Sequence, residues 1–225
     1  SSIVADADHL WHTVDRRGHW RNSLTTTLQM YGRHLVSANA AQDRIPVCGP
    51  LETRPAELLI DAYVLGAWLG DGTSAKAEIT ADERDGLLEQ LTPILGPLRT
   101  TRGRGHVIQI KLPGGIAPLR QIGVLRNKHI PRSYLRGSIA QRTALLQGLM
   151  DTDGTVTALG QAEYCSVREP LALDVMELIT SLGYKPRYSV SDAKIYGRTV
   201  SLRFCLRFTV YSGDPIFRIK RKAAA

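Results

Sequence analysis

The sequence predicts an α+β protein made of two copies of one structural unit. The first sign is a repeated order of elements: an apolar helix that ends in an acid and a glycine, a strand, an amphipathic helix and further strands. The second sign is a shared helix end, LLEQLTPILG (87–96) in one copy and DVMELITSLG (174–183) in the other. We therefore expect two related subdomains that pack about a pseudo-two-fold axis.

The first copy is expected to begin with a helix at Arg54. Pro55 suits a first helical turn, and apolar residues then recur every three or four positions as far as the glycines at 70–72. A glycine there can end the helix because it tolerates a positive φ. The remaining elements expected in this copy are a strand at 74–80, a helix at 81–96 and an alternating strand at 107–112.

The second copy repeats this order from Ala140. A helix that ends in DTDG (151–154), a strand-rich stretch at 155–167 and a second helix at 168–183 are expected. Apolar and other residues alternate in SLRFCLRFTV (201–210), so Arg203, Cys205 and Arg207 should share one face of a strand.

The two helices that end in acids are expected to pack on each other. Gly66 and Gly148 occupy matching positions, and glycine lets two helix backbones approach closely. Asp71 and Asp153 would then meet near the axis, where they repel each other unless a cation lies between them. Carboxylates with water suit Mg²⁺, so the pattern indicates metal-assisted phosphodiester hydrolysis. The alternative is that each Asp-Gly pair is only a turn.

The charge distribution favours a polyanionic partner. The net charge is +8, and no Asp or Glu occurs between Gln90 and Met150, a stretch that holds ten Arg and Lys residues. From Lys194 onward Asp214 is the only acid. Because the basic residues recur on strand-like segments, nucleic acid is the expected partner, with a solvated basic surface as the alternative.

Length and composition indicate a cytoplasmic protein without membrane contact. The chain of 225 residues has no apolar run near the roughly 20 residues of a membrane span, and its first residues lack the pattern of a secretory signal. The cysteines Cys48, Cys165 and Cys205 are widely spaced and odd in number. They form neither a disulfide framework nor a CxxC site, and we expect them to be reduced and to serve in packing.

VLGAWLGDG (64–72) and LQGLMDTDG (146–154) resemble the two motifs of the LAGLIDADG homing endonucleases. The resemblance covers residues 54–211. It implies two αββαββα subdomains whose antiparallel sheets form a saddle over DNA, with the motif helices at the central interface. Duplication within one chain would let a monomer bind an asymmetric double-stranded site.

The resemblance also assigns the reactive residues. NKHIPRSYL (127–135) is similar to the segment between the repeats in intein-borne members, where a lysine approaches the metal, and this implies Lys128. In the second half Lys194 is our choice, ahead of Lys185, and Asp151 is given a structural role. The metal is expected to be Mg²⁺, for which Mn²⁺ can substitute, and its implied ligands are Asp71, Asp153, Gly70 and Thr152.

The strands are expected to read DNA in the major groove, while basic residues supply salt-sensitive affinity. TTRGRGH (100–106) is typical of a hairpin tip that contacts phosphate. The predicted DNA-contacting residues are Arg102, Arg104, Gln109, Lys111, Arg187, Arg198, Arg203 and Arg207.

The flanks resemble those of inteins. DADHLWHTVDRR (6–17) is similar to the block whose histidine assists the first acyl shift, and it assigns His9 as a splicing remnant, with a packed loop histidine as the alternative. The missing N-terminal cysteine and terminal His-Asn lead us to expect that the chain does not splice itself. The boundaries expected are 1–50 for a partial splicing (Hint) domain and linker, 51–138 and 139–212 for the two subdomains, and 213–225 for a return to the splicing domain.

The sequence thus predicts the site-specific, metal-dependent DNA endonuclease domain of an intein. A bacterial replicative DNA helicase is the expected host protein. The alternative is a catalytically decayed endonuclease that serves only as a DNA-binding scaffold within a protein-splicing element.

Overall fold

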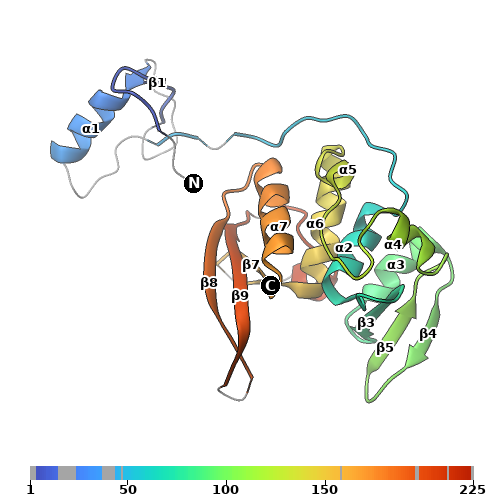
Figure 1. Cartoon of the computed structure of the whole chain (residues 1–225). Helices are drawn as coiled ribbons and strands as arrows, with labels where there is room; N and C mark the ends of the chain where they lie inside the picture. The colour runs from blue at the N-terminus through green and yellow to red at the C-terminus, as the bar shows by residue number, and fades with distance from the viewer. Residues whose placement is uncertain are drawn as a thin grey trace. The chain divides into compact units, whose positions relative to one another are not determined.

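The computed structural model describes residues 4–14, 24–36, 44–46, 48–157, 159–195, 198–211 and 213–223, without the side chains of 34–36, 194 and 195. The chain divides into two compact units, Ser1–Cys48 and Gly49–Ala225, and each is described by itself (Figure 1). The first unit contains strands β1 (Leu10–Trp11) and β2 (Thr25–Thr26), which pair antiparallel, and helix α1 (Thr27–Val36).

The first half of the second unit carries a three-stranded antiparallel sheet. Its strands lie in the order β3-β5-β4, and β4 and β5 form a hairpin whose loop is residues 103–106. The elements are α2 (Ala62–Asp71), β3 (Glu78–Asp82), α3 (Leu87–Leu95), β4 (Arg99–Arg102), β5 (Val107–Lys111), α4 (Ala117–Gln121) and α5 (Arg132–Leu135).

The second half repeats the pattern with a four-stranded antiparallel sheet in the order β6-β7-β9-β8. Strands β8 and β9 form a long hairpin that continues past the end of β7 (Figure 1). The elements are α6 (Ile139–Asp153), β6 (Gly154–Val156), β7 (Gln161–Ser166), α7 (Glu169–Ser181), β8 (Arg187–Ile195), β9 (Arg198–Thr209) and α8 (Lys220–Ala223).

The predicted duplicated α+β fold is therefore confirmed, with one difference between the copies. The second half has the full αββαββα order, whereas the first half has a single bridge between Gly72 and Ile79 where the second half has the pairing of β6 with β7. A turn over residues 74–77 replaces the missing strand. Among the described residues no helix is long and apolar enough to cross a membrane.

Helix α2 begins later than the sequence predicts, and residues 54–61 are not helical. Asp61 is the N-cap, because its carboxylate accepts hydrogen bonds from the backbone N–H groups of Tyr63 and Val64. The Tyr134 hydroxyl accepts a hydrogen bond from the Ile60 N–H and donates one to the Ile60 carbonyl. Both backbone groups of Ile60 are thereby satisfied outside a helix, which outweighs the favourable first-turn position of Pro55.

Helices α2 and α6 pack on each other through their glycines. A Cβ atom added to Gly66 would lie 3.1 Å from the Gly148 Cα, and one added to Gly148 would lie 2.6 Å from the Ala67 nitrogen. Both added atoms would also clash with a carbonyl oxygen of the facing helix. The close approach predicted from these two glycines is therefore confirmed, and every residue of α2 from Ala62 to Leu69 is buried.

Each sheet has one buried face and one open face. In β5, Ile108 and Ile110 are buried while the alternate residues are exposed. In β9, Leu206 and Phe208 are buried on the side covered by α7, whereas Arg203 and Arg207 are exposed. The strand periodicity seen in the sequence therefore places basic residues on the open faces.

Candidate functional site

The packed helices bring Asp71 and Asp153 to one place. Each acid is the last residue of its helix, α2 or α6. A Cβ atom added to Gly70 would lie 3.3 Å from the Asp153 Oδ2 atom, so the end of α2 directly faces that carboxylate. The pair expected from the duplicated motif is thus formed by helix packing.

The two carboxylates destabilise each other's charge. Both side chains reach solvent, yet the surrounding helix ends and strands displace part of their water. Desolvation, followed by repulsion from Asp71, raises the pKa of Asp153 to about 6. The pKa of Asp71 is also raised by desolvation, against the attraction of Lys222 and Lys128. A site that brings two partly desolvated carboxylates together is suited to a cation.

Lys128 lies at this centre, as the sequence predicts. Its Nζ donates a hydrogen bond of 2.7 Å to the Gly70 carbonyl and lies 5.3 Å from the centroid of the Trp68 ring. Burial lowers the pKa of this ammonium to about 8, while Asp153 and Asp71 act in the opposite direction. The lysine therefore contacts the end of α2 and interacts electrostatically with both acids.

The lysine that the second half supplies is Lys222. Its Nζ donates hydrogen bonds to the carbonyls of Met150, Thr152 and Gly154, at 3.0, 3.0 and 2.8 Å. These are carbonyl groups at the C-terminal end of α6, where a cation is favoured. Burial lowers the pKa of Lys222, while Asp151, Asp71 and Asp153 favour its charged form.

The structure does not bring Lys194, the residue chosen from the sequence, to this centre. Its backbone pairs with Thr199 near the tip of the β8–β9 hairpin, beyond the stretch of β9 that pairs with β7, and its side chain is outside the described residues. Lys185 is exposed in the connection before β8. Lys222 was missed because a basic tail carries no motif, although it follows the second repeat much as Lys128 follows the first.

Asp151 holds the C-terminal segment against α6. Its carboxylate accepts hydrogen bonds from the Tyr63 hydroxyl at 2.7 Å and from the backbone N–H groups of Arg218 and Ile219. The Arg218 guanidinium also lies over the Tyr63 ring, 4.1 Å from its centroid. Asp151 is buried, and these contacts place Lys222 at the helix end. Its structural role, which the sequence predicted, therefore includes positioning that lysine.

The residues predicted to contact DNA lie on the two sheets and on their hairpins. Gln109 and Lys111 are exposed on the open face of the first sheet, and Arg187, Arg203 and Arg207 are exposed on the open face of the second. Arg102 and Arg104 lie in the β4–β5 hairpin, which confirms the expected tip, and Arg198 begins β9. Two of these cations have acidic partners, since Arg102 lies 3.4 Å from Glu83 and Arg207 pairs with Glu163.

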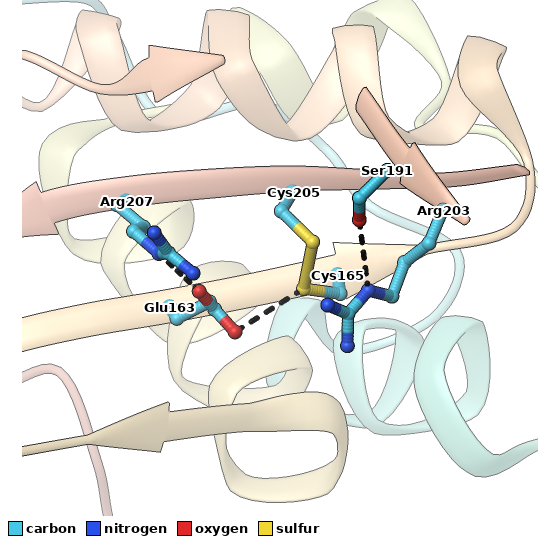
Figure 2. Close-up of a disulfide and its surroundings, with 6 residues drawn as sticks. All are labelled: Glu163, Cys165, Ser191, Arg203, Cys205 and Arg207. Atoms are coloured by element: carbon cyan, nitrogen blue, oxygen red, sulfur yellow. Dashed lines mark hydrogen bonds and ion pairs between the residues drawn. A yellow bond between two sulfur atoms is a disulfide. The ribbon is translucent and has the colours of Figure 1, made fainter. Parts of the chain in front are cut away.

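The expectation that all cysteines are reduced is wrong for this structure. Cys165 and Cys205 form a disulfide between β7 and β9 (Figure 2). They are 40 residues apart in the sequence, and only the strand register places them opposite each other. Cys48 is free and exposed.

His9 lies in the first unit. Its side chain is exposed, and its ring centroid lies 4.4 Å from that of Trp11. The Trp11 indole donates a 2.9 Å hydrogen bond to the Thr27 hydroxyl, which ties β1 to the start of α1.

Replacing Asp153 with asparagine should stabilise the metal-free protein at neutral pH. A carboxyl whose pKa rises on folding does not change the free energy of unfolding at a pH below its unfolded pKa near 3.8. Above that pH it lowers the free energy of unfolding, and the loss grows until the pH passes its folded pKa of about 6. After allowance for solvent screening, we expect a gain of about 1 kcal/mol at pH 8 that vanishes near pH 4. Urea unfolding of both proteins in EDTA measures this, and an equal difference at the two pH values would contradict the electrostatic cause.

Residues 129–225 match the family model described as homing endonuclease. This part of the chain is similar to homing endonuclease sequences. The matched stretch contains Asp153, Lys222 and the whole second sheet. The match therefore covers one of the two motif acids directly, and the duplicated fold relates the other to it.

A curated relative of the chain is the replicative DNA helicase DnaB of Mycobacterium intracellulare. It is 37% identical over 242 residues, an alignment that covers 98% of this chain and 39% of that protein. The chain thus spans about two fifths of the length of this relative.

Two solved structures of the homing endonuclease I-DmoI are similar to the chain. A structure of mesophilic variants has a TM-score of 0.48 at 13% identity, covering 74% of this chain and 96% of that one. A complex with DNA and Mn has a TM-score of 0.46 at 16% identity, covering 67% of this chain and 89% of that one.

Proposed function

We propose that the chain is the site-specific, metal-dependent double-strand DNA endonuclease domain of an intein. The observation that carries this proposal is the convergence of Asp71 and Asp153 at the ends of two packed helices. The homing endonuclease match over residues 129–225 supports the reaction class. The basic open faces of the two sheets supply the surface on which a DNA duplex would lie.

The donor set fits a hard divalent cation such as Mg²⁺ or Mn²⁺. Two carboxylates repel each other there, and desolvation raises both of their pKa values. A divalent cation relieves both the repulsion and the cost of desolvation, because it binds carboxylate oxygens and water. Asp71 and Asp153 would hold the metal. The Gly70 and Thr152 carbonyls, also expected as ligands, accept hydrogen bonds from Lys128 and Lys222 and keep a second lone pair each.

The bound metal would supply a nucleophilic water and stabilise the leaving oxygen of the scissile phosphate. Lys128 and Lys222 bring positive charge beside the two carboxylates and hold the ends of α2 and α6 in place. Charge of this kind stabilises a phosphate as negative charge develops on it. Because one chain contains both halves, we propose a monomer that cuts an asymmetric site.

The proposed host is a replicative DNA helicase. The relative described above bears that name, and the chain aligns with 39% of its length. An intein is an insertion in a host protein, so a match to part of such a protein is what this proposal expects. In this proposal the first unit belongs to the splicing domain, and His9 is the residue carried over from the splicing block.

The function is tested by cleavage of a supercoiled plasmid that carries the uninterrupted helicase-gene insertion site. We expect linear product in Mg²⁺ or Mn²⁺ and none in EDTA or with an Asp71→Asn/Asp153→Asn double variant. Salt-sensitive binding of the same site without cleavage in either metal would instead support a decayed endonuclease that serves as a DNA-binding scaffold.

Lys222 gives a sharper test of the site. Lys222→Met should slow cleavage at least about a hundredfold, because it removes a cation that contacts three carbonyls at the end of α6. Lys220→Met is the matched control, since it removes an exposed lysine from the same short helix and should leave the rate within about twofold. Equal rates for the two variants would remove Lys222 from the proposed site.

A further inference from the structure

A pair of opposed cysteines lies on the open face of the second sheet. Cys165 of β7 and Cys205 of β9 are direct partners in the antiparallel register, with their Cα atoms 4.2 Å apart. Their neighbours along the strands, Tyr164 and Leu206, are buried on the other face. The sulfur atoms therefore lie on the same face as the exposed arginines of β9.

The cysteine pair lies between two of these arginines. Arg203 and Arg207 lie two residues before and after Cys205, so they follow it on the same face at about 7 Å per step (Figure 2). Each arginine is oriented by a neighbouring strand. Arg203 donates to the Ser191 hydroxyl of β8 at 3.4 Å, and Arg207 pairs with Glu163 of β7.

We propose that Cys165 and Cys205 are a reversible thiol-modification site that adjusts how this face binds DNA. The inference rests on the proposed function only in taking this sheet face as a DNA-binding surface. The co-reactant is a low-molecular-weight disulfide of the glutathione type, and the oxidised product is the crosslink between β7 and β9.

The accessibility of the two cysteines assigns their order of reaction. Cys205 is 2% exposed, whereas Cys165 is partly exposed, so Cys165 is the sulfur that a small disulfide can reach. The Cys165 thiolate attacks the small disulfide and releases one small thiol, which leaves a mixed disulfide on Cys165. The Cys205 thiolate then attacks the Cys165 sulfur and releases the second small thiol. The protein loses two electrons and two protons, and the small disulfide becomes two thiols.

The crosslink acts on DNA binding through the arginines beside it. It joins β7 to β9 between the strand positions that carry Arg203 and Arg207, and it thereby holds Glu163 of β7 in place opposite Arg207 of β9. Binding to an already ordered surface costs less conformational entropy. We therefore expect the oxidised chain to bind duplex DNA about three to ten times more tightly than the reduced chain.

The test equilibrates the full chain in buffers of varied reduced-to-oxidised glutathione ratio. Free thiols are alkylated, the disulfide is measured by mass spectrometry, and duplex affinity is measured in the same buffers. We expect one two-electron transition with a matching shift in affinity. Cys165→Ser should abolish both, whereas Cys48→Ser, which removes the free exposed cysteine, should leave both unchanged.

Three results would overturn the proposal. The disulfide fails to form in oxidised glutathione, or it forms without any change in duplex affinity, or Zn²⁺ protects both thiols from alkylation. The last would identify a metal site, because Glu163, Cys165 and Cys205 offer ligand atoms within 4.8 Å of one another. None of these measurements requires cleavage, so a chain that cuts no DNA but shows the coupled transition would disprove only the endonuclease proposal.

Discussion

Replacing Gly148 with alanine should unfold the second unit or leave it barely stable. The added methyl group would lie 2.6 Å from the Ala67 nitrogen and in contact with the Tyr63 carbonyl, both of which belong to the backbone of α2. Backbone atoms in a packed helix pair cannot move aside independently, so the helices must separate. We expect a loss of about 4 kcal/mol or more, measured by urea unfolding, because a separation along this interface opens a fully buried core.

Gly32→Ala is the matched control for this prediction. Gly32 also lies inside a helix, α1, but a Cβ atom added there would have nothing within 4 Å. We expect that variant to be neutral or up to about 1 kcal/mol more stable, because alanine favours a helix over glycine. If Gly148→Ala unfolded at the same urea concentration as the native chain, α2 and α6 would not be in backbone contact.

Asp71→Asn and Asp153→Asn should each reduce the formation of linear plasmid at least about a thousandfold. Each change removes one of the two charges that attract the cation, and asparagine is a poor ligand for Mg²⁺ in place of a carboxylate. Since both acids are proposed to hold the same cation, either single variant should lose nicked circle and linear product to a similar extent. The measurement is a time course on agarose gels with saturating enzyme.

The control for these variants is another acid near the centre. Asp85 acts electrostatically on Asp71 but is paired with Arg221 at 2.9 Å, and it lies outside both motifs. Asp85→Asn should therefore cut at a rate within about threefold of the native chain. A loss of cleavage equal to that of Asp153→Asn would mean that the total negative charge near the centre sets the cleavage rate. The two motif acids would then have no special role.

The sequence predicts the centre of this molecule well because repetition is a strong local signal. Gly66 and Gly148 stand at matching positions, and close helix packing follows directly from their lack of a side chain. The convergence of Asp71 and Asp153 then follows from helix length alone. Lys128 was found for a different reason, since it lies in a segment that resembles a known motif.

The contacts that the sequence did not predict depend on strand register or on the path of the tail. Cys165 and Cys205 meet only because β7 and β9 pair in one register, which no local pattern specifies. Lys222 reaches α6 because Asp151 accepts hydrogen bonds from the backbone of the preceding segment, an interaction between residues 67 positions apart in the case of Arg218. The late start of α2 was missed because the cap at Asp61 competes with a plausible earlier start at Pro55.

Mn²⁺ binding tests directly whether the two motif acids form one cation site. The native chain, the single variants and the double variant would be titrated with Mn²⁺ in the presence of the target duplex, and the free ion counted by electron paramagnetic resonance. We expect bound Mn²⁺ to decrease in each single variant and to disappear in the double variant. Unchanged binding in the double variant would place the metal elsewhere, away from Asp71 and Asp153.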